Sequence, residues 1–96
     1  MDEWHPQNSI IDHDLVLLAK KGLVTKVTIT EHEEGGYFVV MRIKPDEDVI
    51  FLATRRVRNF PRIFMSLERL VSHLRVKMPT VTEMKLVLLR IGQDQK

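Results

Sequence analysis

The chain has 96 residues, enough for one domain with a single modest core. It contains no cysteine, which excludes disulfide bonds, thiolate zinc sites and cysteine nucleophiles. The net charge is only +2, but residues 1–54 hold ten acids and five bases (−5), whereas residues 55–96 hold ten bases and three acids (+7). A chain polarised in this way predicts an anionic partner, or self-association through unlike ends.

The start of the chain and its short apolar runs argue against membrane targeting. The first residues, MDEWHPQNS, are acidic and polar, the opposite of the basic start and apolar core of a signal peptide. No apolar run exceeds five residues, far short of a membrane span. We therefore expect a cytoplasmic protein with no membrane partner. We expect a single domain over residues 1–96, with frayed tails at residues 1–8 and 92–96.

The first predicted element is a helix over residues 10–21. Ser9 has the side chain of a helix N-cap, and Leu15 and Ala19 belong to an apolar series at helical spacing. Gly22 follows two lysines and is a natural left-handed stop. Start and stop signals therefore agree on one short helix.

A three-stranded antiparallel meander is predicted next. From Lys26 to Thr30 and again over residues 37–43, residues alternate between the two faces of a strand, and many are β-branched or aromatic. Residues 33–36 (EEGG) and 44–48 (KPDED) supply the two turns. The third strand, residues 49–55, is almost continuously apolar, as expected for a central strand.

A second helix is predicted over residues 66–77. Ser66 is its N-cap candidate, Met65 and Leu70 are spaced as a hydrophobic staple, and Pro79 marks the end. Residues 81–90 fit a strand or a helix, and we prefer a fourth strand because of the alternation in TVTEMKL. The predicted fold class is α+β with element order α-β-β-β-α-β. Its small antiparallel sheet of three to four strands has the helices packed on one face.

Catalytic and metal-binding motifs are missing from the sequence. No nucleophile elbow, glycine-rich phosphate loop or dinucleotide fingerprint is present. The four histidines have no short metal-binding spacing and are expected to be solvated: His5, His13, His32 and His73. We therefore predict no enzyme, no metal site and no cofactor.

Basic residues gather from the end of the third strand to the second helix. We name this set the basic strand-to-helix surface: Arg55, Arg56, Arg58, Arg62, Arg69, Arg75 and Lys77. Guanidinium groups bind phosphate with two parallel hydrogen bonds, so such a surface predicts binding to a nucleic-acid backbone without sequence preference. An acidic protein surface, or the acidic turns of the same chain, would satisfy the same arginines. Phe60 and Phe64, which flank the joint, are more typical of core anchors than of base-stacking residues.

Self-association is the alternative prediction. A meander leaves at least one sheet edge unpaired, and the opposite charges of the two halves favour an antiparallel homodimer. The sequence therefore leaves two partners open, DNA and protein.

One stretch resembles a known family. Residues 49–87, VIFLATRRVRNFPRIFMSLERLVSHLRVKMPTVTEMKLV, are similar to the ParC-type plasmid partition-associated proteins. In those proteins a strand ending in ATRR-like residues is followed by a phenylalanine, a SLERLVSHL-like helix and a last strand. The resemblance implies a non-catalytic accessory role in the maintenance of plasmids or mobile elements, and it supports a strand at residues 81–90.

Overall fold

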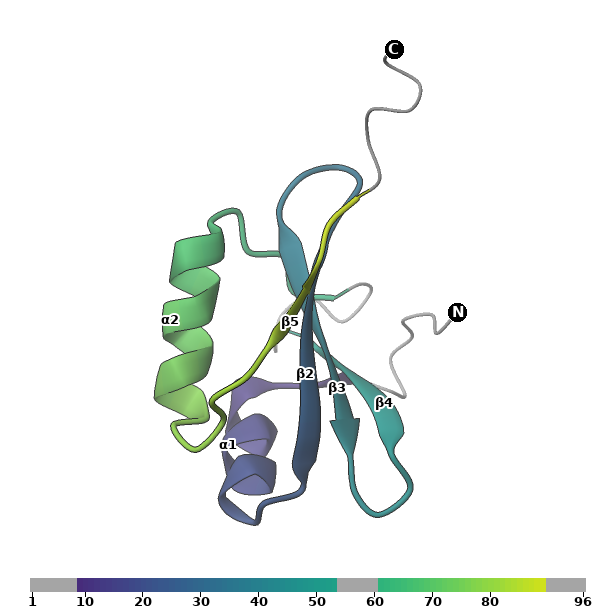
Figure 1. The fold of residues 1–96 in the computed structure, drawn as a ribbon, viewed down its shortest axis with the longest axis vertical. Helices are drawn as coiled ribbons and strands as arrows, with labels where there is room; N and C mark the ends of the chain where they lie inside the picture. Colours follow the sequence, from purple (N-terminus) through teal and green to yellow (C-terminus); the bar gives the residue numbers. More distant parts are fainter. Residues whose placement is uncertain (1–8, 54–60, 90–96) are drawn as a thin grey trace.

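The computed structural model describes residues 9–53 and 61–89. Within them the chain forms a five-stranded mixed sheet and two helices (Figure 1). The elements in chain order are β1 (Ser9–Ile10), α1 (Asp12–Lys20), β2 (Val24–Glu31), β3 (Tyr37–Ile43), β4 (Asp48–Leu52), α2 (Leu67–Lys77) and β5 (Lys85–Val87). The predicted α+β class is confirmed. The expected tails at residues 1–8 and 92–96 lie outside the described residues.

The strand order is β1-β4-β3-β2-β5. The meander β2-β3-β4 is antiparallel, as predicted, but each outer strand pairs in parallel, so the prediction of an antiparallel sheet of three to four strands was wrong. Parallel pairing requires a crossover connection between the paired strands. The segment containing α2 lies between β4 and β5 in the chain, which lets β5 return beside β2 in the same direction.

The N-terminal strand also corrects the first helix. Ser9 of β1 pairs with Phe51 of β4, and the N–H of Ala53 donates to the carbonyl of Ile10 at 2.8 Å. Because this ladder holds the backbone extended, α1 begins only at Asp12, and Ile11 rather than Ser9 takes the N-cap position. A nine-residue helix therefore replaces the one expected over residues 10–21.

The other helix signals mostly hold. Gly22 (φ +72°) follows α1, and its N–H and that of Leu23 donate to the carbonyls of Ala19 and Leu18, the two bonds of a Schellman motif. Ser66 caps α2, because its hydroxyl accepts a hydrogen bond from the N–H of Arg69. The predicted staple is wrong: the side chain of Met65 is exposed, whereas that of Leu70 is fully buried.

Two strands are shorter than expected. β4 ends at Leu52, so Ala53 is not part of the strand, and the last two residues of the predicted strand, 54 and 55, lie outside the described residues. Within the described part of the predicted residues 81–90, β5 covers only Lys85–Val87, and Val81 and Met84 before it pack against the core. The strand interpretation of this segment is nevertheless correct at its centre, where Leu86 pairs with Ile29.

The core lies between the sheet and the two helices. Alternate residues of the central strands point to it, and they meet Leu15 of α1 and Leu70 and Leu74 of α2. The buried strand residues are Val27, Ile29, Val39, Met41, Ile43 and Leu52. Both helices cover the same face, as predicted, and no helix of the described residues covers the opposite face (Figure 1). That helix-free face holds the candidate site.

Candidate nucleic-acid interface

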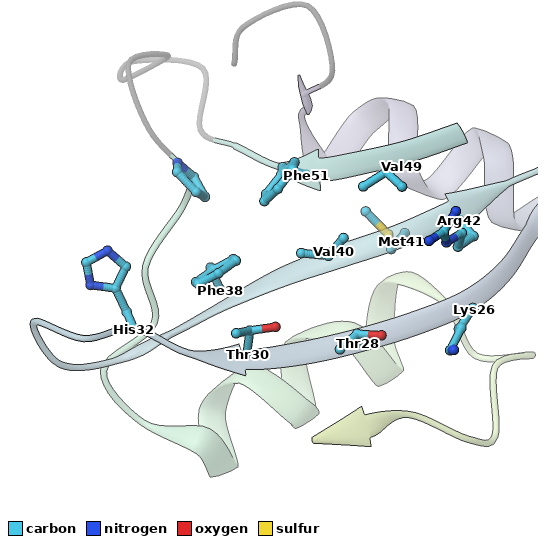
Figure 2. A pocket seen from close by; sticks show the side chains of 11 residues that line it. Lys26, Thr28, Thr30, His32, Phe38, Val40, Met41, Arg42, Val49 and Phe51 are labelled. Atoms are coloured by element: carbon cyan, nitrogen blue, oxygen red, sulfur yellow. The ribbon is translucent and has the colours of Figure 1, made fainter. Parts of the chain in front are cut away.

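A groove runs along the helix-free face of β2, β3 and β4, with a volume of about 380 Å³. We call it the sheet-face groove. Figure 2 shows its side chains projecting from neighbouring strands. It is lined by Lys26, Thr28, Thr30, His32, Phe38, Val40, Met41, Arg42, Val49, Phe51 and Pro61. Its size falls at the lower end of the usual range for small-molecule pockets, so it can take one planar group.

Strand register assembles the groove. Thr30 pairs with Phe38, and Val40 pairs with both Thr28 and Phe51, so these alternate residues share one face. Their neighbours in sequence enter the core on the other face. The helix-free face is therefore built by three strands whose residues alternate, with apolar side chains on the core side and both polar and aromatic side chains on the groove side.

Aromatic rings form a row across this face. The rings of Phe38 and Phe51 are stacked, with centroids 6.0 Å apart and planes at 18°, and His32 meets Phe38 edge-on at 6.0 Å. Phe51 is only 4% exposed, whereas Phe38 and His32 are half-buried. Phe51 thus forms the buried end of the row beside Phe38, and Phe38 presents the accessible ring.

The ionisable groups that line the groove are all bases. Lys26 and Arg42 stand together at one end and His32 at the other (Figure 2), and no carboxylate belongs to the lining among the described residues. Arg42 is also anchored, because its guanidinium donates to the carbonyl of Glu47 at 3.2 Å. Basic groups beside an accessible aromatic ring suit a ligand that carries both a planar ring and a negative charge.

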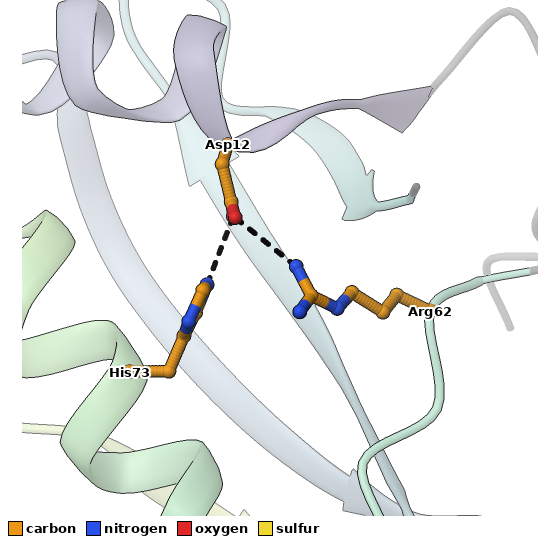
Figure 3. Close-up of polar contacts among 3 residues, drawn as sticks. All are labelled: Asp12, Arg62 and His73. Atoms are coloured by element: carbon orange, nitrogen blue, oxygen red, sulfur yellow. Dashed lines mark hydrogen bonds and ion pairs between the residues drawn. The ribbon is translucent and has the colours of Figure 1, made fainter. Parts of the chain in front are cut away.

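A second polar cluster joins three separate segments on the helical side of the sheet. One carboxylate oxygen of Asp12, at the start of α1, accepts from the guanidinium of Arg62, and the other lies 3.0 Å from Nε2 of His73 in α2 (Figure 3). The guanidinium carbon of Arg62 also lies 4.5 Å from the ring centroid of Phe64, which in turn packs 5.3 Å from the His73 ring.

The pKa of Asp12 depends on two opposing effects, the burial of its carboxyl group and its contacts with His73 and Arg62. Burial alone would raise the pKa, but the hydrogen bond and charge of His73, followed by those of Arg62, outweigh burial and lower the pKa below its ordinary value. Asp12 is therefore ionised at neutral pH and ties the start of α1 to α2. The cluster acts as a structural clamp.

The structure describes four residues of the basic strand-to-helix surface, Arg62, Arg69, Arg75 and Lys77, and of these Arg69 and Lys77 line one hollow beside α2 together with His73. Arg62 faces the Asp12 carboxylate. Arg69 and Arg75 are exposed on α2, and Lys77 is half-buried. Arg75 and Lys77 are two residues apart, which is about 200° around a helix, so they point to opposite sides. Arg55, Arg56 and Arg58 lie outside the described residues.

The expectation of solvated histidines is right for His13 and wrong for His73, and His32 is half-buried against Phe38. His13 is exposed as expected, but His73 is held by Asp12 and Phe64, because α2 packs beside the start of α1. His5 lies outside the described residues. Within residues 9–53 and 61–89, no three His, Cys, Asp or Glu side chains are placed to hold a metal ion. None of the helices found there is long and apolar enough to cross a membrane.

Sequence reasoning missed the sheet-face groove. The sequence did carry a signal for it in the outward-facing residues of the alternating strands. These residues are Phe38, Val40 and Arg42 in β3 and Thr28 and Thr30 in β2. Alternation shows that these residues share a face, but not whether a helix covers it. Only the placement of both helices on the opposite side leaves this face open.

In comparisons with protein-family models, with curated proteins and with solved structures, no match to this chain was found. The functional argument therefore rests on the chain's own residues.

Proposed function

We propose that this protein is a non-enzymatic module that binds single-stranded nucleic acid in the sheet-face groove. One observation carries the proposal: the accessible ring of Phe38 lies in a groove whose ionisable lining residues are all basic. A nucleotide combines the two matching groups, a flat base and a phosphate. A duplex hides the faces of its bases, so single strands are the favoured form.

The groove offers a place for each part of a nucleotide. A base stacks on Phe38, whose ring is held in place by Phe51. The hydroxyls of Thr28 and Thr30 can donate to or accept from any base, which makes recognition tolerant of sequence. Lys26 attracts the phosphate at the end of the groove.

A cellular role follows from the sequence. The resemblance of residues 49–87 to the ParC-type plasmid partition-associated proteins supports an accessory role in plasmid or mobile-element maintenance, in the cytoplasm. Genes for partition or conjugation next to the coding sequence are the expected observation. A location among unrelated housekeeping genes contradicts this role without touching the binding proposal.

Fluorescence anisotropy with a labelled oligothymidylate tests the binding site. We expect binding at low salt that weakens as salt rises, because phosphate contacts release counterions. Phe38→Leu keeps an apolar side chain but removes the stacking face, and should weaken binding by about fivefold or more, since each stacked base contributes ~1–3 kcal/mol. Lys26→Gln should reduce the dependence of affinity on salt.

The matched control is Val76→Ala, which changes an exposed apolar residue on α2, on the other side of the sheet. It should bind like the unmodified chain. The absence of any binding at low salt, or unchanged affinity in a folded Phe38→Leu variant, contradicts the proposal. Equal affinity for a duplex of the same length would place the contact on backbone phosphates instead of Phe38.

A second candidate function is protein interaction, the alternative that the sequence left open. It is favoured by a separate observation, the exposed apolar residues in the edge strand β5 and directly after it, Leu86, Val87, Leu88 and Leu89.

A further inference from the structure

The outer edge of β5 is an open strand edge with apolar side chains. β5 is the last strand in the sheet order, and no strand of the described residues pairs with its outer side (Figure 1). Four consecutive large apolar residues at this edge are exposed: Leu86 by 42%, Val87 by 37%, Leu88 by 60% and Leu89 by 40%. Monomeric proteins normally protect such an edge with charges, proline or a covering segment. This edge therefore has the composition of an interface.

An apolar hollow lies next to the same edge. It opens between α2 and β5, with a volume of about 490 Å³, and its lining includes Leu67, Val71, Met84 and Leu86. Leu88, the most exposed of the four edge residues, follows Leu86 by two positions and so continues on the same side of an extended chain. The edge thus combines a projecting leucine with a recess whose lining is mainly apolar, apart from Arg75 and Thr82.

We propose that a second copy of this chain pairs with β5 in antiparallel orientation and forms one continuous ten-stranded sheet. The proposed two-fold axis passes beside Val87. Leu86 of each copy then lies opposite Leu88 of the other, and the projecting Leu88 meets the mouth of the hollow beside Leu86. All four exposed apolar residues of each copy enter the interface in this register.

Charge favours this register. Each Lys85 lies opposite the apolar Leu89 of the second copy, so the two lysines stay apart. A register centred on Lys85 would instead bring the two lysines face to face, which is destabilising.

Pairing of β5 with the β5 strand of a second copy is favoured over pairing of β5 with β1, the opposite edge of the sheet. The opposite edge, β1, has only two residues, and pairing β5 with β1 would produce an open chain of molecules. Pairing β5 with itself uses the same patch on both copies and closes after two. A two-fold axis perpendicular to the sheet places both helical layers on one side and both sheet-face grooves on the other.

Sedimentation equilibrium of the full chain without nucleic acid tests the dimer. We expect a mass near twice 11.3 kDa. Leu88→Lys should give the monomer mass, because it places a charge in the apolar interface. Val76→Lys makes the same kind of change at an exposed site on α2 and should remain dimeric. A monomer at high concentration, or a Leu88→Lys variant that stays dimeric, overturns the proposal.

A cysteine substitution tests the register, since the chain has no cysteine of its own. Val87→Cys should form an intermolecular disulfide on mild oxidation, because residues on the two-fold axis have Cα atoms about 4.5–5.5 Å apart, within disulfide range. Val76→Cys should not cross-link under the same conditions. A dimer in which Val87→Cys fails to cross-link overturns the β5 pairing. These results do not depend on nucleic acid, and Phe38→Leu should leave the dimer intact, so this proposal and the binding proposal can fail separately.

Discussion

Replacement of Asp12 by alanine should destabilise the protein more than its position in an exposed first turn suggests. The substitution removes two hydrogen bonds made by a carboxylate, to Arg62 and to His73, each at 3.0 Å. A hydrogen bond to a charged group contributes about 1.5–3 kcal/mol. The side chains of Asp12, Arg62 and His73 are 27%, 31% and 21% exposed, so water recovers part of the loss. We expect the free energy of unfolding to fall by about 2–3 kcal/mol.

Urea denaturation followed by circular dichroism measures this loss. With a slope of about 1 kcal/mol per M, the midpoint should fall by about 2–3 M, and the slope should not change. Asp14→Ala is the matched control, because Asp14 is an exposed acid in the same first turn of α1. Its loss should cost only about 0.3–1 kcal/mol through the helix dipole. Equal losses in the two variants would refute the clamp.

The difference in urea midpoint between Asp12→Ala and Asp14→Ala should also depend on pH. The pKa of Asp12 is lower in the folded chain than its ordinary value of 3.8, so the stabilisation is present above that value and is lost as pH falls below it. The midpoints of Asp12→Ala and Asp14→Ala should therefore converge in acid. A gap that stays constant to the lowest pH at which the protein folds would show that the ionised carboxylate is not its cause.

Three further substitutions test two glycines with positive φ and the N-cap of α2. A Cβ added at Gly36 (φ +84°) would lie 2.5 Å from Cγ2 of Ile63 and 2.9 Å from the carbonyl oxygen of Phe64, so Gly36→Ala should cost about 2–4 kcal/mol from strain and overpacking. Gly22 (φ +72°) has no atom within 4 Å of the added Cβ, so Gly22→Ala should cost only about 1–2 kcal/mol, and equal thermal shifts would contradict this difference. Ser66→Ala should cost about 1 kcal/mol by removing the N-cap of α2, measured as a fall in the urea midpoint, and an unchanged midpoint would contradict the cap.

Local signals predicted the parts of the fold that local chemistry controls. Ser66 begins α2 and Gly22 ends α1 where the sequence indicated, because a cap and a left-handed residue act on their own turn of backbone. The β2-β3 hairpin followed from alternation and from Gly35-Gly36. Ser9 failed as a cap because its backbone pairs with Phe51, forty-two positions away, and no local pattern reports such a pairing.

The sequence by itself determined which residues alternate along the strands, where α2 begins and that bases concentrate in the second half of the chain. Only the tertiary structure decided what those residues face. It turned Arg62 and His73 towards Asp12, placed Arg69 and Lys77 on one hollow beside α2, and left Phe38 in an open groove that has Lys26 at one end. The physical reason is that a side chain's partner depends on which elements pack together. Packing joins segments far apart in sequence, whereas periodicity and capping describe only neighbours.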